Sequence, residues 1–333
     1  MAQVRRRWLP VGAGVLVIGL VPVIVGDSLP APSAASPSPS AIAPSPTGPR
    51  TTTPLWIAPR PPRPSEPDPV AVLLAAGDIA SCSSSGDEVT GRMLDRLSGT
   101  IAPLGDIAYG YGSTANFSEC FDPSWGRHRA RMRPAVGNHE YMTAAGAPYF
   151  SYFGAAAGDP ARGYYSYDLG AWHVVVLNSN CDRVSCAAGS AQERWLRADL
   201  TAPGQRCTLA YWHHPLFTSG ANHAGLTAVR PLYRALYDAG AEVVLAGHNH
   251  QYERFAPLAP DGAYDPARGI RSFVVGTGGG SHYPFGTVNR YSEARNSTAY
   301  GFLRLTLRST SYSWQFVPEP GKTYQDSGTG TCH

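Results

Sequence analysis

Five short apolar segments, each about as long as one β-strand, end in polar residues, and this arrangement constrains the fold more than any other feature. The segments are 70–76, 101–104, 134–136, 208–212 and 243–246. They lack the alternation of apolar and polar positions, which is typical of strands covered on both faces. The polar residues at their ends are Asp78, Asp106 with Tyr109, Asn138, His213, and His248 with His250.

Helical spacing of apolar residues occurs between some of these segments. It predicts helices at 87–97, 191–200 and 227–239. Strands that alternate with helices indicate an α/β sandwich, in which the polar residues gather at the carboxyl edge of the sheet. Two hairpins are also expected, one pairing 163–168 with 172–178 and one pairing 302–307 with 312–316.

The first 69 residues differ in composition from the rest of the chain. Arg5, Arg6 and Arg7 precede an apolar stretch at 8–25, so residues 1–27 are predicted to be an export signal, with a resemblance to twin-arginine signals. The stretch could instead remain as an uncleaved membrane anchor, and both alternatives stay open. Residues 28–69 are mostly Pro, Ala, Ser and Thr, which predicts a disordered linker. Residues 70–333 remain as one folded domain.

The charge of the folded part is balanced. From residue 70 onward the chain has 21 Lys plus Arg and 21 Asp plus Glu. Tight nonspecific binding to nucleic acid needs clustered cations, so we expect no nucleic-acid partner. The one dense arginine run, from Arg127 to Arg133, is interpreted as the solvated face of a helix.

Six cysteines lie downstream of the predicted signal. An even number in an exported chain favours disulfides, and six cysteines allow fifteen pairings. Zinc ligation is disfavoured because no Cys-x-x-Cys occurs. The pairs that we predict are Cys82 with Cys120, Cys181 with Cys186, and Cys207 with Cys332.

The polar residues at the strand ends are the donor types that two metal ions require. Carboxylate and phenolate oxygens suit a hard ion such as ferric iron, while imidazole and amide donors suit a divalent ion. Taken alone, an aspartate after glycine is more often a turn or helix-cap residue. Gly247-His248-Asn249-His250 is more specific, because two imidazoles two residues apart on an extended segment point the same way. Either His213 or His214 supplies the remaining strand-end imidazole.

In this order, the five clusters resemble the five motif blocks of the calcineurin-like metallophosphoesterases, and most closely those of the purple acid phosphatases. The family pattern reads Asp-x-Gly, Gly-Asp-x-x-Tyr, Gly-Asn-His-Glu, His-x-Pro and Gly-His-x-His. The corresponding segments here are 78–80, 105–109, 137–140, 213–215 and 247–250. The chain departs from the pattern at Ala80, where glycine is usual, but this change removes no ligand.

The resemblance implies a four-layer α/β/β/α sandwich of two mixed sheets flanked by helices. It places ferric iron at a first site with Asp78, Asp106, Tyr109 and His250. The second site is formed by Asn138, His213 and His248, with Asp106 bridging, and is open to ferrous iron, zinc or manganese. His139 and His223 are the implied proton-transfer residues, and Glu140 is expected to orient His139.

The implied activity is hydrolysis of phosphate monoesters by a metal-activated hydroxide, in a protein that is secreted or tethered to a membrane or cell wall through its N-terminus. We expect the loops 113–122 and 144–160 to shape the pocket for a small phosphoester. Two alternatives are a phosphodiesterase or nucleotide hydrolase with the same metal site, and a non-catalytic cell-surface binding protein.

Overall fold

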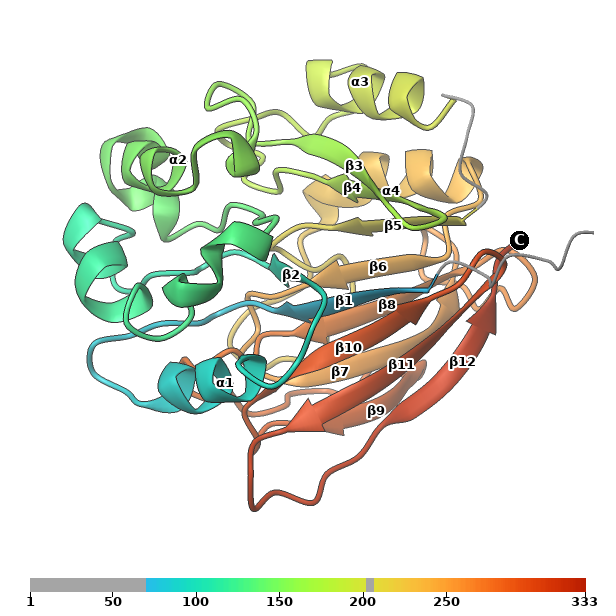
Figure 1. The fold of residues 1–333 in the computed structure, drawn as a ribbon. Coiled ribbons are helices and arrows are strands. Elements are labelled where there is room, and N and C mark those ends of the chain that lie inside the picture. Colours follow the sequence, from blue (N-terminus) through green and yellow to red (C-terminus); the bar gives the residue numbers. More distant parts are fainter. Residues whose placement is uncertain (1–69, 202–206) are drawn as a thin grey trace, which may run out of the picture. The chain divides into compact units, whose positions relative to one another are not determined.

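The computed structural model describes residues 70–201 and 207–333, so the predicted export signal and linker lie outside the described residues. Two β-sheets pack face to face, with helices on their outer sides (Figure 1). This confirms the predicted α/β sandwich of two mixed sheets flanked by helices. Within the two described ranges, no helix has both the length and the apolar character that crossing a membrane requires.

The smaller sheet has five strands and carries the first two polar clusters. Strand β1 pairs in parallel with β2 on one side and antiparallel with β10 on the other. In sheet order the strands are β12 (Ser327–Thr331), β11 (Ser311–Pro318), β10 (Gly301–Leu307), β1 (Ala71–Ala76) and β2 (Thr100–Pro103).

The larger sheet has seven strands, of which the four central ones are parallel. In sheet order they are β3 (Tyr165–Leu169), β4 (Trp172–Val176), β5 (Cys207–Tyr211), β6 (Val243–Ala246), β8 (Ile270–Val275), β7 (Tyr252–Leu258) and β9 (Ser292–Asn296). Both predicted hairpins are present, as β3 with β4 and β10 with β11.

In the part of the chain that the structure describes, four α-helices and several shorter helical turns cover the sheets. The α-helices are α1 (Gly86–Leu94), α2 (Ala147–Phe153), α3 (Ala191–Asp199) and α4 (Arg230–Asp238). The shorter turns are a π-helix at Asn116–Phe121 and 3-10 helices at Gly126–Arg131, Glu140–Met142, Ala144–Gly146, Gly154–Ala157 and Thr227–Val229. In Figure 1, α3 and α4 lie outside the larger sheet and α1 lies beside the smaller one.

The core explains why the central strands lack alternation. Along β4, Val174 and Val176 join the apolar cluster shared by the two sheets, whereas Val175 joins the cluster that contains Leu196 of α3 and Leu236 of α4. Successive side chains of a strand point to opposite faces, so a strand between two apolar layers needs apolar residues at every position.

One sequence prediction about local structure is wrong, and another holds only in part. Residues 134–136 do not form a strand, because Pro134 has no N–H to donate and only Ala135 pairs, through an isolated bridge to Leu104. The arginine run is a solvated helix face only at Arg127 and Arg129, which are exposed on the 3-10 helix Gly126–Arg131. Within it, the Arg131 guanidinium donates to the backbone carbonyls of Leu94 and Leu97, at 2.6 and 2.7 Å.

All three predicted disulfides are present. Cys82–Cys120 joins the loop after β1 to the π-helix, and Cys181–Cys186 closes a small loop after β4. Cys207–Cys332 joins the start of β5 to the end of the chain. No cysteine is free.

Candidate metal centre

The polar clusters meet where the carboxyl ends of β1 and β2 in one sheet face those of β5 and β6 in the other. Hydrogen bonds of the predicted ligands connect the sheets directly at this edge. His213, after β5, donates from Nδ1 to the carbonyl oxygen of Leu104 at 2.8 Å, and the backbone N–H of His248 donates to Oδ2 of Asp78 at 2.7 Å. The site therefore lies at the junction of the two sheets.

Three of the predicted ligands have a left-handed backbone conformation. The φ angles are 58° at Asp78, 48° at Asp106 and 70° at His248. This region is sparsely populated by residues other than glycine and is retained where surrounding structure enforces it, commonly at functional sites. Here the sharp turn after each strand directs the side chain into the site and not along the strand.

The glycines directly before Asp106 and His248 are explained by close packing. Gly105 has a φ of 84°, and a Cβ atom at this position would lie 2.6 Å from Nδ1 of His213. At Gly247 a Cβ would lie 2.7 Å from Oδ2 of Asp78. Glycine at these positions lets backbone and ligand approach each other. The same reasoning applies to Gly276, where a Cβ would lie 2.7 Å from Oδ2 of Asp78.

A first group of donors surrounds the phenol oxygen of Tyr109. This oxygen lies 2.8 Å from Oδ1 of Asp78, 2.8 Å from Nε2 of His250 and 3.3 Å from Oδ2 of Asp106. Asp78, Asp106 and His250 are buried. These four residues are the set that the sequence assigns to the first metal.

A second group surrounds Nε2 of His213. This nitrogen lies 3.1 Å from Oδ1 of Asn138, 3.2 Å from Nδ1 of His248 and 3.3 Å from Oδ2 of Asp106. Oδ2 of Asp106 is thus equally distant from the central atoms of both groups. All seven predicted ligands come together, in two groups that share one carboxylate.

The protonation pattern of the histidines suits a bound cation. His213 and His250 each use Nδ1 to donate to a backbone carbonyl, that of Leu104 and that of Ser281 respectively. In the neutral imidazole this leaves the Nε2 lone pair directed into the site. Metal-bound histidines are commonly oriented by such a second hydrogen bond. The converging lone pairs and carboxylates need positive charge among them, so the residues fit two metal ions.

The electrostatics of the protein side chains alone support the same conclusion. Burial acts to lower the pKa of His213, but the charge and hydrogen bond of Asp106 outweigh it and raise the pKa to about 9. Burial and the carboxylates of Asp78 and Asp106 raise the pKa of Tyr109 well above 10. Without a metal ion, a proton on His213 supplies the positive charge beside Asp106 that a bound cation would supply. Tyr109 needs a nearby cation to become a phenolate, so both residues favour metal ions in the site.

Glu140 does not orient His139, and that prediction is wrong. The buried Glu140 carboxylate accepts hydrogen bonds from the backbone N–H groups of Asp106, Ile107 and Gly137, at 2.9, 2.8 and 2.8 Å. It thereby ties together the two loops that carry Asp106 and Asn138. Nδ1 of His139 instead contacts the carbonyl oxygen of Gly110.

The two predicted proton-transfer histidines border different donor groups. Nε2 of His139 lies 3.8 Å from Oδ2 of Asp106, and the ring packs edge-on to Tyr109 at 4.6 Å between centroids. The ring of His223 lies 4.2 Å from that of His248. The loop of His223 is anchored by Asn249, whose side-chain amide donates to the His223 carbonyl at 3.1 Å.

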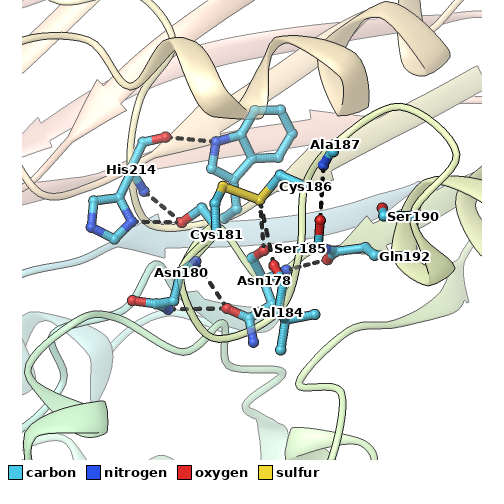
Figure 2. Close-up of a disulfide and its surroundings, with 12 residues drawn as sticks. Asn178, Asn180, Cys181, Val184, Ser185, Cys186, Ala187, Ser190, Gln192 and His214 are labelled. Carbon is cyan, nitrogen blue, oxygen red and sulfur yellow. Dashed lines mark hydrogen bonds between the residues drawn. A yellow bond between two sulfur atoms is a disulfide. The ribbon is translucent and has the colours of Figure 1, made fainter.

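A second layer of residues surrounds the donor groups. It includes His214, which the sequence left open as the alternative to His213, and Tyr283, to which the sequence assigned no role. His214 lies with its ring 4.4 Å from that of His248, and its Nδ1 is 2.8 Å from the hydroxyl oxygen of Ser179. Figure 2 shows His214 beside the loop closed by the Cys181–Cys186 disulfide. Tyr283 stacks on His250 with 3.9 Å between centroids. These contacts join segments that are distant in the sequence, so no local sequence pattern predicts them.

Comparison with known proteins agrees with this geometry. The sequence model described as Calcineurin-like phosphoesterase matches residues 57–252, a range that includes all seven predicted ligands. Purple acid phosphatase 15 of Arabidopsis thaliana is 25% identical over 226 residues, covering 57% of this chain and 41% of that protein. An uncharacterized Mycobacterium tuberculosis protein is 27% identical over 228 residues, covering 54% of this chain and 43% of the other. The chain thus spans less than half the length of these curated relatives.

Two solved structures share the fold. Purple acid phosphatase PPD1 from yellow lupin seeds has a TM-score of 0.67 at 18% identity, covering 79% of this chain and 54% of that one. GAP50 of Plasmodium has a TM-score of 0.63 at 11% identity, covering 80% of this chain and 90% of that one. With the sequence match over more than half its length, the chain belongs to the calcineurin-like phosphoesterase family, as a member similar to the purple acid phosphatases.

Proposed function

We propose that this protein is an exported phosphatase that uses two metal ions to hydrolyse phosphate monoesters. The observation that carries the proposal is the pair of donor groups around Tyr109 and His213, which share Oδ2 of Asp106. A shared carboxylate holds two ions close together, and ions roughly 3.5–4 Å apart form the usual clamp for phosphoryl transfer.

The fold alone would not carry this proposal. GAP50, which has the same fold, is described as an anchor in the inner membrane complex of Plasmodium. A fold can host unrelated functions, so function has to be argued from the site. This chain retains the complete set of seven donors, which a protein with a purely adhesive role does not need.

The metal ions and the two histidines have different roles in the proposed reaction. When bound, two metal ions supply neutralisation of the phosphate charge and lower the pKa of water, so that hydroxide forms at mild pH. His139 and His223 stand at the margins of the donor groups, where they can donate hydrogen bonds to phosphate oxygens. One of them delivers the proton that the departing alcohol needs, a contribution of about 10²- to 10⁴-fold in rate.

The donor sets also support an assignment of the metals. Asp78, Asp106 and Tyr109 present three oxygens with His250, a set suited to ferric iron. Asn138, His213 and His248 present a neutral, nitrogen-rich set suited to ferrous iron, zinc or manganese. Three disulfides agree with an extracytoplasmic location, where they persist.

Metal analysis with a visible spectrum, combined with ester hydrolysis, tests the proposal. The exported wild-type protein should contain two metal ions, absorb visible light through a tyrosinate–iron bond, and cleave an aryl phosphate monoester faster than the matching diester. Tyr109→Phe should abolish the absorption band. Tyr237→Phe is the matched control, because its hydroxyl bonds Asp265 at 2.6 Å outside the metal centre.

The outcomes separate the parts of the proposal. A colourless, active protein with zinc or manganese would refute the ferric assignment only. Faster cleavage of the diester would favour the phosphodiesterase alternative. A protein that holds two metals and cleaves no phosphoester would refute the enzymatic proposal.

A further inference from the structure

A pocket of about 400 Å³ opens directly beside the donor group of Tyr109. This volume is near the lower end of the range for pockets that bind small molecules. Tyr109, His139 and His250 form its inner end, where the phosphate would sit. The outer walls come from the loop after β1 and from the segments that follow β8 and β9, and include Ser81, Ser83, Ser84, Ser281, Tyr283 and Tyr300. The loops 113–122 and 144–160, which we expected to shape the pocket, contribute no lining residue.

The outer walls contain hydroxyl groups and aromatic rings held in fixed positions. The hydroxyl oxygens of Ser81 and Ser83 lie 2.8 Å apart, and that of Ser84 donates to the carbonyl of Gly279 at 3.2 Å. Tyr283 is stacked on His250, and Tyr300 is stacked on His282 with 4.2 Å between centroids. Aromatic surface with a few placed hydroxyls is suited to a compact, uncharged organic group.

No lysine or arginine lines the described pocket. Two acidic side chains, Glu319 and Asp87, act on Tyr300 of the outer wall. The backbone N–H of Tyr300 donates to a carboxylate oxygen of Glu319 at 3.2 Å. Burial, followed by the charges of Glu319 and Asp87, raises the pKa of the Tyr300 phenol. The chain's one lysine, Lys322, is exposed and does not line the pocket.

We propose that this pocket holds the alcohol part of the substrate and selects monophosphate esters of small uncharged alcohols over esters that carry several phosphates. The inference rests on the proposed phosphatase activity and specifies its substrate class. Each additional phosphate would bring up to two negative charges into the outer part of a pocket that no lysine or arginine lines. Proteins that bind several phosphates pair them with arginine or lysine, because an unpaired charge loses its hydration without compensation.

A matched pair of substrates tests this selection without changing the alcohol. The metal-loaded full-length protein is assayed with inositol monophosphate and with inositol hexakisphosphate at constant ionic strength. We expect kcat/KM to be at least tenfold higher for the monophosphate. Equal values, or a preference for the hexakisphosphate, would overturn the inference. Hydrolysis of neither inositol ester nor of an aryl phosphate would instead refute the proposed phosphatase itself.

A charge inserted into the pocket gives a second, independent test. Ser83 is exposed and lines the pocket, so Ser83→Arg should place a cation next to extra phosphates. The preference for the monophosphate should then fall by about three- to tenfold, as expected for one partly exposed ion pair. Ser85→Arg is the matched control, because Ser85 is exposed on the same loop but does not line the pocket. An unchanged preference in a folded Ser83→Arg protein, or an equal change in both variants, would contradict the proposal.

Discussion

Nε2 of His213 lies 3.3 Å from Oδ2 of Asp106, although the two residues follow strands of different sheets. The donor groups therefore connect the two halves of the sandwich, and metal binding should stabilise their packing. A ligand that binds only the folded state stabilises it by about 2.7 kcal/mol at a concentration one hundred times its Kd. We expect a strong chelator to lower the melting temperature, and restored metal to recover it. An unchanged melting temperature after complete metal removal would contradict this coupling.

Asp106→Asn should remove the carboxylate that both donor groups share. The amide keeps the size of the side chain but loses the negative charge, so we expect the protein to retain at most one metal ion. Loss of affinity should exceed the roughly 10- to 100-fold that is typical when a residue supporting a metal ligand is changed. Metal content after dialysis measures the effect.

Asp199→Asn provides the control for that variant. Asp199 also pairs with a histidine, since its carboxylate lies 2.8 Å from Nε2 of His173, but it is outside the donor groups. Its metal content should match that of the wild type. Equal metal loss in both variants would show a general effect of breaking an Asp–His pair.

Glu140→Gln should weaken metal binding without removing a ligand. Glu140 accepts four backbone N–H groups from the loops of Asp106 and Asn138. In glutamine, the NH₂ group replaces one accepting oxygen and would point a donor at some of these N–H groups. We expect a loss of about 3 kcal/mol in the free energy of unfolding, as for other buried charged hydrogen-bond networks. Metal affinity should also fall about 10- to 100-fold.

Glu253→Gln separates these two effects. Glu253 is equally buried and accepts the backbone N–H of Ser219 at 2.7 Å, away from the donor groups. It should lower stability but leave metal affinity unchanged. A comparable loss of affinity in both variants would mean that Glu140 acts only through overall stability.

The sequence predicted the part of the site that depends on local pattern. Strands β1, β2, β5 and β6 are apolar at nearly every position and are followed within two residues by glycine or a ligand, so their positions and their convergence could be inferred. Strands β9 and β12 could not, because Ser292–Asn296 and Ser327–Thr331 are polar edge strands without a buried apolar face. In β7, a charged residue is fully buried at Glu253, which contradicts any simple apolar pattern.

The parts of the site that were missed depend on contacts across the fold. Glu140 follows His139 directly, which favoured a local role, yet its carboxylate reaches the backbone of Ile107 more than thirty positions away. Likewise, Tyr283 stacks on His250, and Ser81 and Tyr300 line the same pocket, although these residues are far apart in the sequence. Such pairings are decided by the packing of the two sheets and not by neighbouring residues.

The disulfides should differ in their contribution to stability. Cys207–Cys332 spans 125 positions, whereas Cys181–Cys186 spans 5. By loop-closure entropy, replacing the first pair with serines should cost about 5 kcal/mol in the free energy of unfolding, and replacing the second about 2 kcal/mol. Denaturant unfolding of the two double variants measures both. A greater loss for the short loop would indicate that it stabilises the native state by contacts, such as those that hold Ser179 against His214.

Glu242 should make stability depend on pH. Its carboxylate is buried and accepts the backbone N–H groups of Thr208 and His333, at 2.6 and 3.2 Å. Burial raises its pKa from 4.5 to about 7. Between these values the folded protein keeps a proton that the unfolded chain has released, so the free energy of unfolding falls as pH rises.

Glu242→Gln should remove this dependence, because glutamine does not titrate in the same environment. We expect the variant to lose less stability than the wild type between about pH 5 and about pH 8, with the difference approaching a few kcal/mol at the upper end. Urea unfolding at several pH values measures it. Glu119→Gln serves as the control, because it removes an exposed carboxylate and leaves the buried carboxylate of Glu242 in place. A wild-type stability that rises over this range, or parallel profiles for wild type and Glu242→Gln, would show that the carboxyl of Glu242 ionises as freely in the folded protein as in the unfolded chain.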